Sequence, residues 1–230
     1  MHKYWHSLAQ IHQRQTGGYC YVGSGTVGSE LRTQLIAAGH DVRAVATSRQ
    51  VTFYRNNERH DSLPVGSVDD AAIKIKVNNP DIAALMIAMP NGNKGIDELR
   101  YMLNFHDKII VTCAKAAHAY QYHSIRDHKL SIGNSASCGG GTDMLDTLRR
   151  RRLRDESLTI YAVLNGTKNY IFSQVQQGAS FMSALRAAQK LGYAEPGNGS
   201  PVKILNGELM DSCMKATIVN NIALANTERG

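Results

Sequence analysis

The stretch YCYVGSGTVG, residues 19–28, decides the fold of this chain. It begins with four apolar or aromatic residues, as in a buried strand, and continues into three spaced glycines and a helical pattern. In a GxGxxG turn the first glycine permits a tight bend, and the second lets the backbone approach a pyrophosphate. The third lets the helix pack on the strand, so that the helix N-terminus can bind the phosphates. The stretch therefore predicts a dinucleotide-binding turn, with the cofactor-binding residues Gly23, Gly25, Thr26, Val27 and Gly28.

The residues around this turn alternate between strand and helix patterns. Strands are predicted at residues 19–22, 41–46, 82–88 and 108–112, and the first helix at residues 26–38. A second helix is predicted from an apolar face of Ile96, Leu99 and Leu103, whereas residues 49–80 carry no clear pattern. Because strands and helices alternate at βαβ spacing, we expect an α/β fold. Residues 1–134 are predicted to form a Rossmann-type domain with a doubly wound parallel sheet.

The remaining residues, 135–230, are predicted to form a second domain. The predicted elements are a helix ending in the arginine run 149–154, a strand at residues 158–164, and helices at residues 166–177, 181–191 and 211–224. Asn165-Gly166 indicates a turn before the second of these helices, and Ser180 is a good N-cap for the third.

The composition excludes several classes of protein. The 230 residues are 43% apolar and 20% charged, which is typical of a globular chain rather than a disordered one. The longest apolar run, residues 82–89, is too short to cross a bilayer. The four cysteines lack metal-ligand spacing, and the first sixteen residues do not resemble a secretory signal. We therefore expect a cytoplasmic protein with reduced thiols, no bound metal and no membrane contact.

The net charge of +7 raises the question of a nucleic-acid partner. Much of the charge lies in the run from Arg149 to Arg154, at the end of a predicted helix, where the helix dipole favours cations. The run has no interleaved aromatic residues, and the chain carries no nucleic-acid-binding motif. We therefore interpret the run as a solvated helix end and expect no nucleic acid among the partners.

The end of the second predicted strand bears on the choice of cofactor. An NAD-preferring site carries an acidic residue there, which binds the ribose 2′-hydroxyl. This chain has Ser48 and Arg49 instead, and both can bind a 2′-phosphate. We therefore expect NADP, with NAD as an open alternative and with Arg49 as an ordinary surface residue in that case.

Lys115 follows the predicted strand 108–112 and so lies at the carboxyl end of a strand, where open α/β sheets bind ligands. A lysine there can contact a carbonyl or a carboxylate. From its position alone, Lys115 is equally well interpreted as an ordinary surface lysine.

Several segments together give the chain a family resemblance. They are residues 23–28, VTCAKA at 111–116, SASCGGG at 135–141, VLNGTKNYI at 163–171, LGYAEP at 191–196 and DSCMK at 211–215. In this order and spacing the chain resembles the homoserine dehydrogenase family. The segment 163–171 is the most distinctive.

The resemblance implies an NAD(P)-dependent oxidoreductase that interconverts aspartate semialdehyde and homoserine, in the threonine and methionine branch of amino-acid biosynthesis. It implies that residues 135–230 are part of an α+β substrate-binding and dimerisation domain, and that the protein is a homodimer. The site residues that it implies are Lys115 and Lys215 as catalytic lysines, Lys115 also at the cofactor, and Glu195, Asp211 and Thr167 at the substrate.

These residue types suit the chemistry of such a substrate. A buried acid such as Glu195 can hold the substrate ammonium, and a lysine ammonium can stabilise and protonate the alkoxide that hydride transfer creates. Asp211 and Lys215 are spaced i, i+4, so a helix presents both on one face. Without the resemblance, an exposed ion pair of little energetic consequence is the simpler interpretation of that pair.

The chain departs from the family pattern at several positions. Ala114 replaces an asparagine, Ser135 replaces a glutamate near a monovalent-cation segment, and Lys168 replaces a small hydroxyl residue. Residues 196–210, rich in glycine and proline, are predicted to form a loop that is longer than the family's and lacks most of its acidic residues. The chain also stops soon after Lys215, which we interpret as a shortened form or a fragment. These departures motivate an alternative, a catalytically weakened homologue that binds a dinucleotide as a sensor or regulatory module. A third candidate is a Rossmann oxidoreductase such as an aspartate dehydrogenase, against which the segment 165–171 argues.

Overall fold

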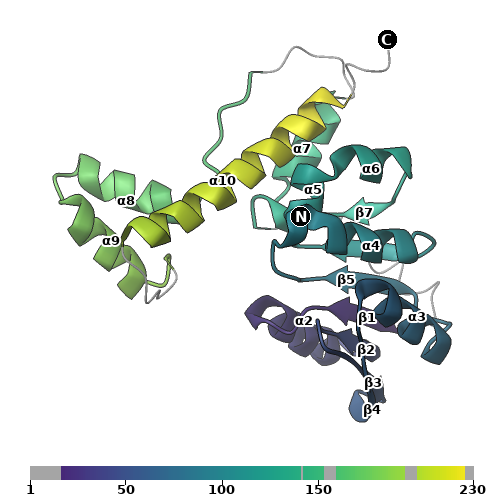
Figure 1. Cartoon of the computed structure of the whole chain (residues 1–230). Helices are drawn as coiled ribbons and strands as arrows, with labels where there is room; N and C mark the ends of the chain where they lie inside the picture. The colour runs from purple at the N-terminus through teal and green to yellow at the C-terminus, as the bar shows by residue number, and fades with distance from the viewer. Residues whose placement is uncertain (1–16, 141, 153–158, 195–200, 226–230) are drawn as a thin grey trace. The chain divides into compact units, whose positions relative to one another are not determined.

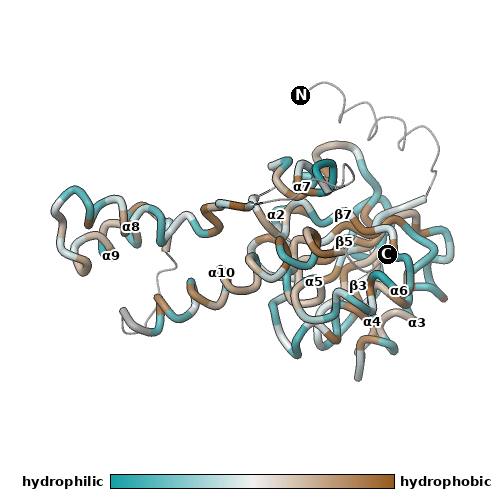
Figure 2. Tube along the Cα trace, turned by 90° about the horizontal axis from the view of Figure 1, so that it is seen from above, coloured by the Kyte–Doolittle hydropathy of each residue, from teal (hydrophilic) through white to brown (hydrophobic). Residues whose placement is uncertain are grey.

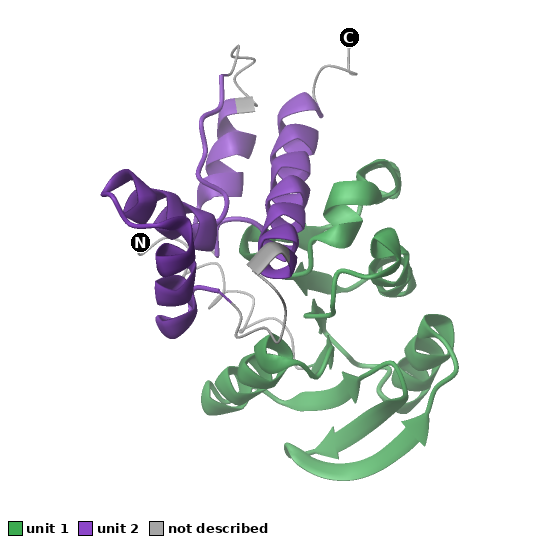
Figure 3. Ribbon diagram, turned by 60° about the vertical axis from the view of Figure 1, so that its left-hand side comes forward, with its two compact units in different colours: residues 1–137 green, residues 138–230 purple. Residues whose placement is uncertain are grey.

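The computed structural model describes residues 17–140, 142–152, 159–194 and 201–225. The chain divides into two compact units, residues 1–137 and residues 138–230 (Figure 3).

The first unit contains a seven-stranded sheet in the order β4-β3-β2-β1-β5-β6-β7 (Figure 1). Its strands are β1 (Tyr19–Val22), β2 (Val42–Ala46), β3 (Gln50–Arg55), β4 (Glu58–Pro64), β5 (Ala84–Ile87), β6 (Ile109–Thr112) and β7 (Ile132–Gly133). The five strands β2, β1, β5, β6 and β7 are parallel, which confirms the Rossmann-type α/β prediction. The edge pair β3 and β4 is antiparallel and extends this sheet beyond the prediction.

Helices lie on both faces of the sheet. The helices and short turns of this unit are α2 (Thr26–Ala37), α3 (Val68–Asn78), η1 (Asn93–Gly95), α4 (Ile96–Asn104), α5 (Ala116–Tyr120), α6 (Tyr122–Asp127) and η2 (Ser135–Ser137). In β1, Cys20 and Val22 pack in one cluster with α3 and α4, while Tyr21 packs in another with α2. This alternation is the period of two that a strand imposes on its side chains. Figure 2 shows the hydrophobic residues of β5 in brown within this core.

The antiparallel edge and helix α3 together account for most of residues 49–80, where no element was predicted. Asn56 and Asn57 form the tight turn between β3 and β4 with positive φ values of 53° and 63°. Asparagine tolerates this conformation better than most residues, and such turns match the twist of a hairpin. The Asn57 amide also bonds to Val42 N–H and to the His40 carbonyl, which ties the hairpin to the start of β2.

The helix predicted around residues 96–103 is confirmed as α4, but its buried face differs from the prediction. Ile96 is 39% exposed, whereas Glu98, Tyr101 and Met102 are buried. The prediction followed the apolar residues and missed a buried carboxylate. Hydrogen bonds to Glu98, described below, compensate for its burial.

The second unit consists of α7 (Met144–Arg152), α8 (Gly166–Gln176), α9 (Phe181–Lys190) and α10 (Pro201–Leu224) within its described residues. The predicted N-cap is confirmed, because the Ser180 hydroxyl accepts from Ser183 N–H. The final helix starts at Pro201, ten residues before the predicted start at residue 211. A proline is well placed at the first position of a helix, where its missing N–H is not needed.

The strand predicted at residues 158–164 is wrong for residues 159–164, which adopt no regular structure. A strand needs a neighbour for its backbone hydrogen bonds, and the described residues of this unit supply none. Tyr161 and Val163 are accordingly 93% and 72% exposed. Residue 158 lies outside the described residues.

Candidate active site

The glycine turn connects β1 to α2, and its three glycines have different roles. Gly23 has φ +110°, and a Cβ there would lie 2.2 Å from the Ala88 carbonyl oxygen. A Cβ on Gly28 would lie 2.3 Å from the Gly23 oxygen, so the helix packs too closely on the turn for a side chain. At Gly25 a Cβ would meet no protein atom within 4 Å. The first and third glycines are therefore required by the fold, whereas the second leaves open space for a ligand.

A cavity of about 560 Å³ adjoins this turn. It is lined by residues that follow three neighbouring parallel strands: Gly23, Ser24 and Gly25 after β1, Thr47 and Ser48 after β2, and Met89 and Pro90 after β5. The chain leaves β1 toward β2 on one side and later returns to β5 on the other. This is the switch point at the carboxyl ends of the strands, where doubly wound sheets bind ligands. The cavity and the open side of Gly25 fit the pyrophosphate and adenosine part of a dinucleotide.

The two residues predicted to bind a 2′-phosphate differ in their placement. Ser48 lines the cavity, while Arg49 is exposed at the start of the turn into β3. The Thr47 hydroxyl oxygen accepts from Arg49 N–H at 3.2 Å and from Gln50 N–H at 3.1 Å. This turn fixes the backbone of Arg49 and leaves its guanidinium in solvent.

Sequence reasoning missed two arginines beside the same turn. A second cavity of about 380 Å³ shares Ser24 and Thr47 with the first and is also lined by Arg32 and Arg59. The Arg32 guanidinium carbon lies 4.4 Å above the centre of the Tyr54 ring, and its terminal nitrogen donates to the Asn57 carbonyl. Arg59 belongs to the unpredicted hairpin, so its approach to the glycine turn depends on strand pairing.

Lys115 lies between β6 and α5, at the carboxyl end of the sheet. Its backbone N–H donates to the Asn91 side-chain oxygen at 2.9 Å. The buried carboxylate of Glu98 lies next to this turn and accepts from Thr112 Oγ1 and from Ala117 N–H, both at 2.9 Å. Burial raises the pKa of Glu98, whereas these hydrogen bonds and the Lys115 charge act in the opposite direction. Asn91 and Glu98 were not predicted.

In the second unit the structure brings two of the predicted site residues, Asp211 and Lys215, into contact. Lys215 Nζ and Asp211 Oδ2 are 2.6 Å apart on α10, with 18% and 25% of their side chains exposed. The Asn165 amide, at the N-cap of α8, donates to Glu208 Oε2 and, at 3.4 Å, to Asp211 Oδ2. Thr167, two residues after Asn165, is buried, and its hydroxyl donates to the Tyr193 carbonyl.

Glu208 was missed because residues 196–210 were interpreted as a loop poor in acids. Once residues 201–224 form one helix, Glu208, Asp211 and Lys215 recur at spacings of three and four and so share a face. The helix period was the signal that could have found Glu208.

Two positions that the sequence analysis singled out are not part of the described structure. Glu195 and Gly141 lie outside the described residues. Among the residues that are described, no group of three or more His, Cys, Asp or Glu side chains has metal-binding geometry. No described helix is both long and apolar enough to cross a membrane.

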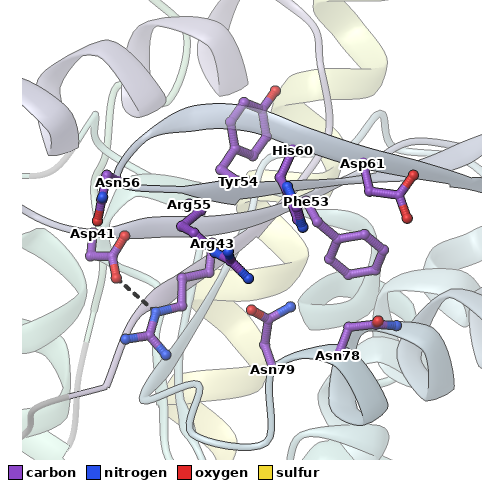
Figure 4. A pocket seen from close by; sticks show the side chains of 10 residues that line it. All are labelled: Asp41, Arg43, Phe53, Tyr54, Arg55, Asn56, His60, Asp61, Asn78 and Asn79. Carbon is purple, nitrogen blue, oxygen red and sulfur yellow. Dashed lines mark hydrogen bonds and ion pairs between the residues drawn. The ribbon is translucent and has the colours of Figure 1, made fainter.

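Figure 4 shows a further polar pocket of about 370 Å³ in the first unit, lined by Asp41, Arg43, Arg55, His60 and Asn79 among others. Asp41 directly precedes β2, and Asn79 precedes β5. The pocket therefore lies at the amino ends of the parallel strands, opposite the glycine turn. Arg43 is held there by Asp41 at 2.7 Å and by Asp81.

The sheet order, the glycine turn and the switch-point cavity define a protein of the Rossmann class. Two solved structures share the fold. A hyperthermophilic archaeal homoserine dehydrogenase in complex with NADPH matches 90% of this chain and 69% of its own, with a TM-score of 0.66 and 17% identity. The homoserine dehydrogenase of Thermoplasma acidophilum also matches 90% of this chain and 69% of its own, with a TM-score of 0.59 and 20% identity.

Sequence comparison finds similarity to one family of this class. The family described as homoserine dehydrogenase matches residues 144–228. The homoserine dehydrogenase of Synechocystis sp. is 34% identical over 185 residues, which are 76% of this chain and 40% of that protein. That of Mycobacterium leprae is 27% identical over 228 residues, 91% of this chain and 48% of that protein. The chain is thus related to the homoserine dehydrogenase family, as its motifs predicted, and spans about half the length of these relatives.

Proposed function

We propose that this chain carries the dinucleotide domain and part of the catalytic domain of an NADP-dependent homoserine dehydrogenase. The proposed reaction interconverts aspartate semialdehyde and homoserine. Residues 1–134 would bind the cofactor, and residues 135–230 would bind the substrate. The observation that carries the proposal is the similarity to homoserine dehydrogenases, which runs through both units: the match to the M. leprae enzyme covers 91% of this chain.

The cavity at the glycine turn supports NADP(H) as the cofactor. Helix α2 directs its first free N–H groups toward the turn, and Gly25 leaves room for phosphate oxygens. Ser48 and Arg49 would bind the 2′-phosphate through a hydroxyl and a guanidinium. A neighbour in fold was solved with NADPH, which agrees with this choice.

The proposed chemistry needs a cation close to the aldehyde oxygen. Bound NADPH would supply the hydride. Lys115 and Lys215 would then hold ammonium groups toward the oxygen that becomes negatively charged, and one of them would donate the proton that completes the alcohol. In the reverse direction the same lysine, unprotonated, would take the proton from the hydroxyl of homoserine.

The acids of the second unit would bind the polar end of the substrate. Asp211 and Glu195 would accept hydrogen bonds from the substrate ammonium, and Thr167 would border the substrate. Asn165 links Asp211 to the N-terminus of α8, because its Oδ1 accepts from Lys168 N–H at 2.8 Å while its amide nitrogen donates to Asp211. This link supports a rigid substrate pocket rather than an exposed ion pair.

The test is NADPH oxidation by the purified full chain with aspartate semialdehyde, beside NADPH binding measured by calorimetry. We expect turnover whose kcat falls by orders of magnitude, to a residual rate that is still measurable, in Lys115→Ala, while the Kd for NADPH changes little. Tight NADPH binding with no turnover would indicate a sensor instead, and no binding would contradict the proposed cofactor. Oxaloacetate with ammonia is the control substrate for an aspartate dehydrogenase.

We also propose that the protein acts as a cytoplasmic homodimer. In the second unit Tyr161, Val163 and Phe172 are 93%, 72% and 62% exposed, and apolar surface of this kind is typical of subunit contacts. All four cysteines are free, which agrees with a reducing compartment. Light scattering of the eluted protein should give twice the chain mass of 25.2 kDa, and a monomer at micromolar concentration would contradict the dimer.

A further inference from the structure

Glu98 is a buried carboxylate that the proposed mechanism leaves without a role. It lies on α4 with only 2% of its surface exposed. Its Oε1 accepts from the Thr112 hydroxyl at the end of β6, and its Oε2 accepts from Ala117 N–H in the first turn of α5. The carboxylate therefore bridges the two ends of the segment 113–116, which contains Lys115.

Thr112 extends the same bridge into the backbone. Its hydroxyl oxygen accepts from Ala114 N–H at 3.0 Å, and the hydroxyl also lies 3.3 Å from the Ile87 carbonyl oxygen on β5. The hydroxyl thus fixes the first bend after β6. Together, Thr112 and Glu98 bind the N–H groups of the residues on either side of Lys115 and Ala116.

The loop that precedes α4 also contacts the segment that contains Lys115. Asn91 accepts from Lys115 N–H, and the Gln121 amide donates to the Lys94 carbonyl at 3.0 Å. Gly95 approaches α5 so closely that a Cβ there would lie 2.2 Å from Ala117 N. Asn91 and Glu98 thus hold the N–H groups of Lys115 and Ala117, while Thr112 holds that of Ala114.

We propose that Glu98 is a positioning residue, whose carboxylate holds the turn between β6 and α5 in the conformation that presents Lys115 to the substrate. This inference rests on the proposed function, because it takes the role of Lys115 from there. The residue types agree with it. A carboxylate is costly to bury, as the raised pKa of Glu98 indicates, and an apolar side chain could fill the same space on α4 without that cost.

Two substitutions at Glu98 separate the hydrogen bonds from the charge. In Glu98→Gln the amide oxygen can still accept from Ala117 N–H, and the amide nitrogen can donate to Thr112 Oγ1, whose hydroxyl then donates to Ile87. In Glu98→Ala both bonds are lost. We expect Glu98→Ala to lower kcat about a hundredfold with little change in the KM for NADPH. Glu98→Gln should retain kcat within about threefold of the unchanged chain.

A double substitution tests whether Glu98 acts through Lys115. On the Lys115→Ala background, Glu98→Ala should produce no further loss of kcat, because the group that it positions is gone. Asp107→Asn is the matched control: this acid lies at the other end of β6, is 58% exposed, and pairs only with its neighbour Lys108 among the ion pairs described. It should leave kcat unchanged. If Glu98→Ala lowered kcat by the same factor in the unchanged chain and in Lys115→Ala, the proposal would be overturned.

Amide hydrogen exchange gives a readout that does not depend on catalysis. In Glu98→Ala the amides of Lys115 and Ala117 should exchange at least about tenfold faster, while those of β1 and β5 keep their protection. Wild-type-like exchange at both amides, or the same acceleration in Glu98→Gln, would overturn the proposal. If the unchanged chain fails to turn over aspartate semialdehyde, the proposed function fails while the exchange result still decides whether Glu98 holds this turn.

Thr112 offers a second pair of variants if Glu98→Ala does not fold. Thr112→Ser keeps the hydroxyl, and Thr112→Val removes it at similar volume. We expect the serine variant to preserve the protection of the Ala114 amide against exchange and the valine variant to lose it. The serine variant should therefore keep its kcat, and the valine variant should have a lower kcat. Equal protection in the two variants would contradict the bridge.

Discussion

Lys215 and Asp211 face each other on α10, with Nζ and Oδ2 2.6 Å apart and with the Asn165 amide 3.4 Å from the same carboxylate oxygen. An exposed pair at this spacing contributes little to folding. This pair is mostly shielded from solvent, and it is joined to the N-terminus of another helix. That arrangement is expected where a carboxylate is held ready for a ligand.

Asp211→Asn should therefore affect catalysis far more than folding. We expect kcat/KM for aspartate semialdehyde to fall by about 10- to 100-fold, because a charge-assisted hydrogen bond to the substrate ammonium is lost. The melting temperature should change little. Asp146→Asn in α7 is the control, since Asp146 pairs with Arg149 at the same distance of 2.6 Å. An equal loss of activity in both variants would contradict a substrate role for Asp211.

The three glycines of the turn should respond differently to alanine. Gly23→Ala should destabilise the first unit by about 1–3 kcal/mol, because it combines a positive φ with a clash against the Ala88 carbonyl. Gly25→Ala should fold normally, because its φ is −71° and its Cβ meets no protein atom within 4 Å. Its Kd for NADPH should nevertheless rise at least about tenfold, because the methyl group fills the space proposed for phosphate. Thermal unfolding measures the loss of stability in Gly23→Ala, and calorimetry measures the Kd for NADPH in Gly25→Ala. An unchanged Kd in Gly25→Ala would contradict the proposed site.

Arg49→Ala tests the choice of cofactor. We expect the Kd for NADPH to rise by about 10- to 100-fold while the Kd for NADH stays within about twofold, because only NADPH carries the 2′-phosphate. Arg55→Ala is the control, since Arg55 is also exposed and lies at the far end of β3 from Arg49. A parallel loss of both cofactors in Arg49→Ala would indicate a general structural effect.

The pKa of Glu98 predicts a dependence of stability on pH. Burial raises the pKa of this carboxyl in the folded chain, so the folded state binds its proton more tightly than the unfolded state does. Its contribution to stability is complete below the unfolded pKa and is lost as pH rises through the folded pKa. The free energy of unfolding of the unchanged chain minus that of Glu98→Gln should therefore decrease as pH rises above the ordinary pKa of a glutamate, about 4.3. Urea denaturation at several pH values measures it, and a constant difference would contradict the raised pKa.

Local patterns were sufficient for the elements that repeat a simple period. The strand β1 and the start of α2 lie where the sequence predicted them, because apolar runs and the glycine spacing act within a few residues. The helix α10 was predicted too short, since a proline and a glycine before residue 211 suggested a loop. Pro201 instead begins the helix, and Gly207 lies exposed within it.

The failures share a physical cause. The hairpin of β3 and β4 is stabilised by pairing with β2, and its polar outer strand carries no hydrophobic pattern of its own. The strand predicted at residues 158–164 has the right residues but no described neighbour to pair with. In both cases the outcome depends on hydrogen bonds to distant segments, which a local pattern does not contain.

The sequence by itself determined the class of fold, the glycine turn, the family resemblance and the identity of the candidate lysines and acids, because each depends on short runs of adjacent residues. Only the tertiary structure decided which distant groups surround them: Asn165 beside Asp211, Arg59 near the glycine turn, and Glu98 next to the Lys115 turn. Those partners lie tens of residues away along the chain. Pairing of strands and packing of helices bring them together, so the chemistry of the site is a property of the folded chain.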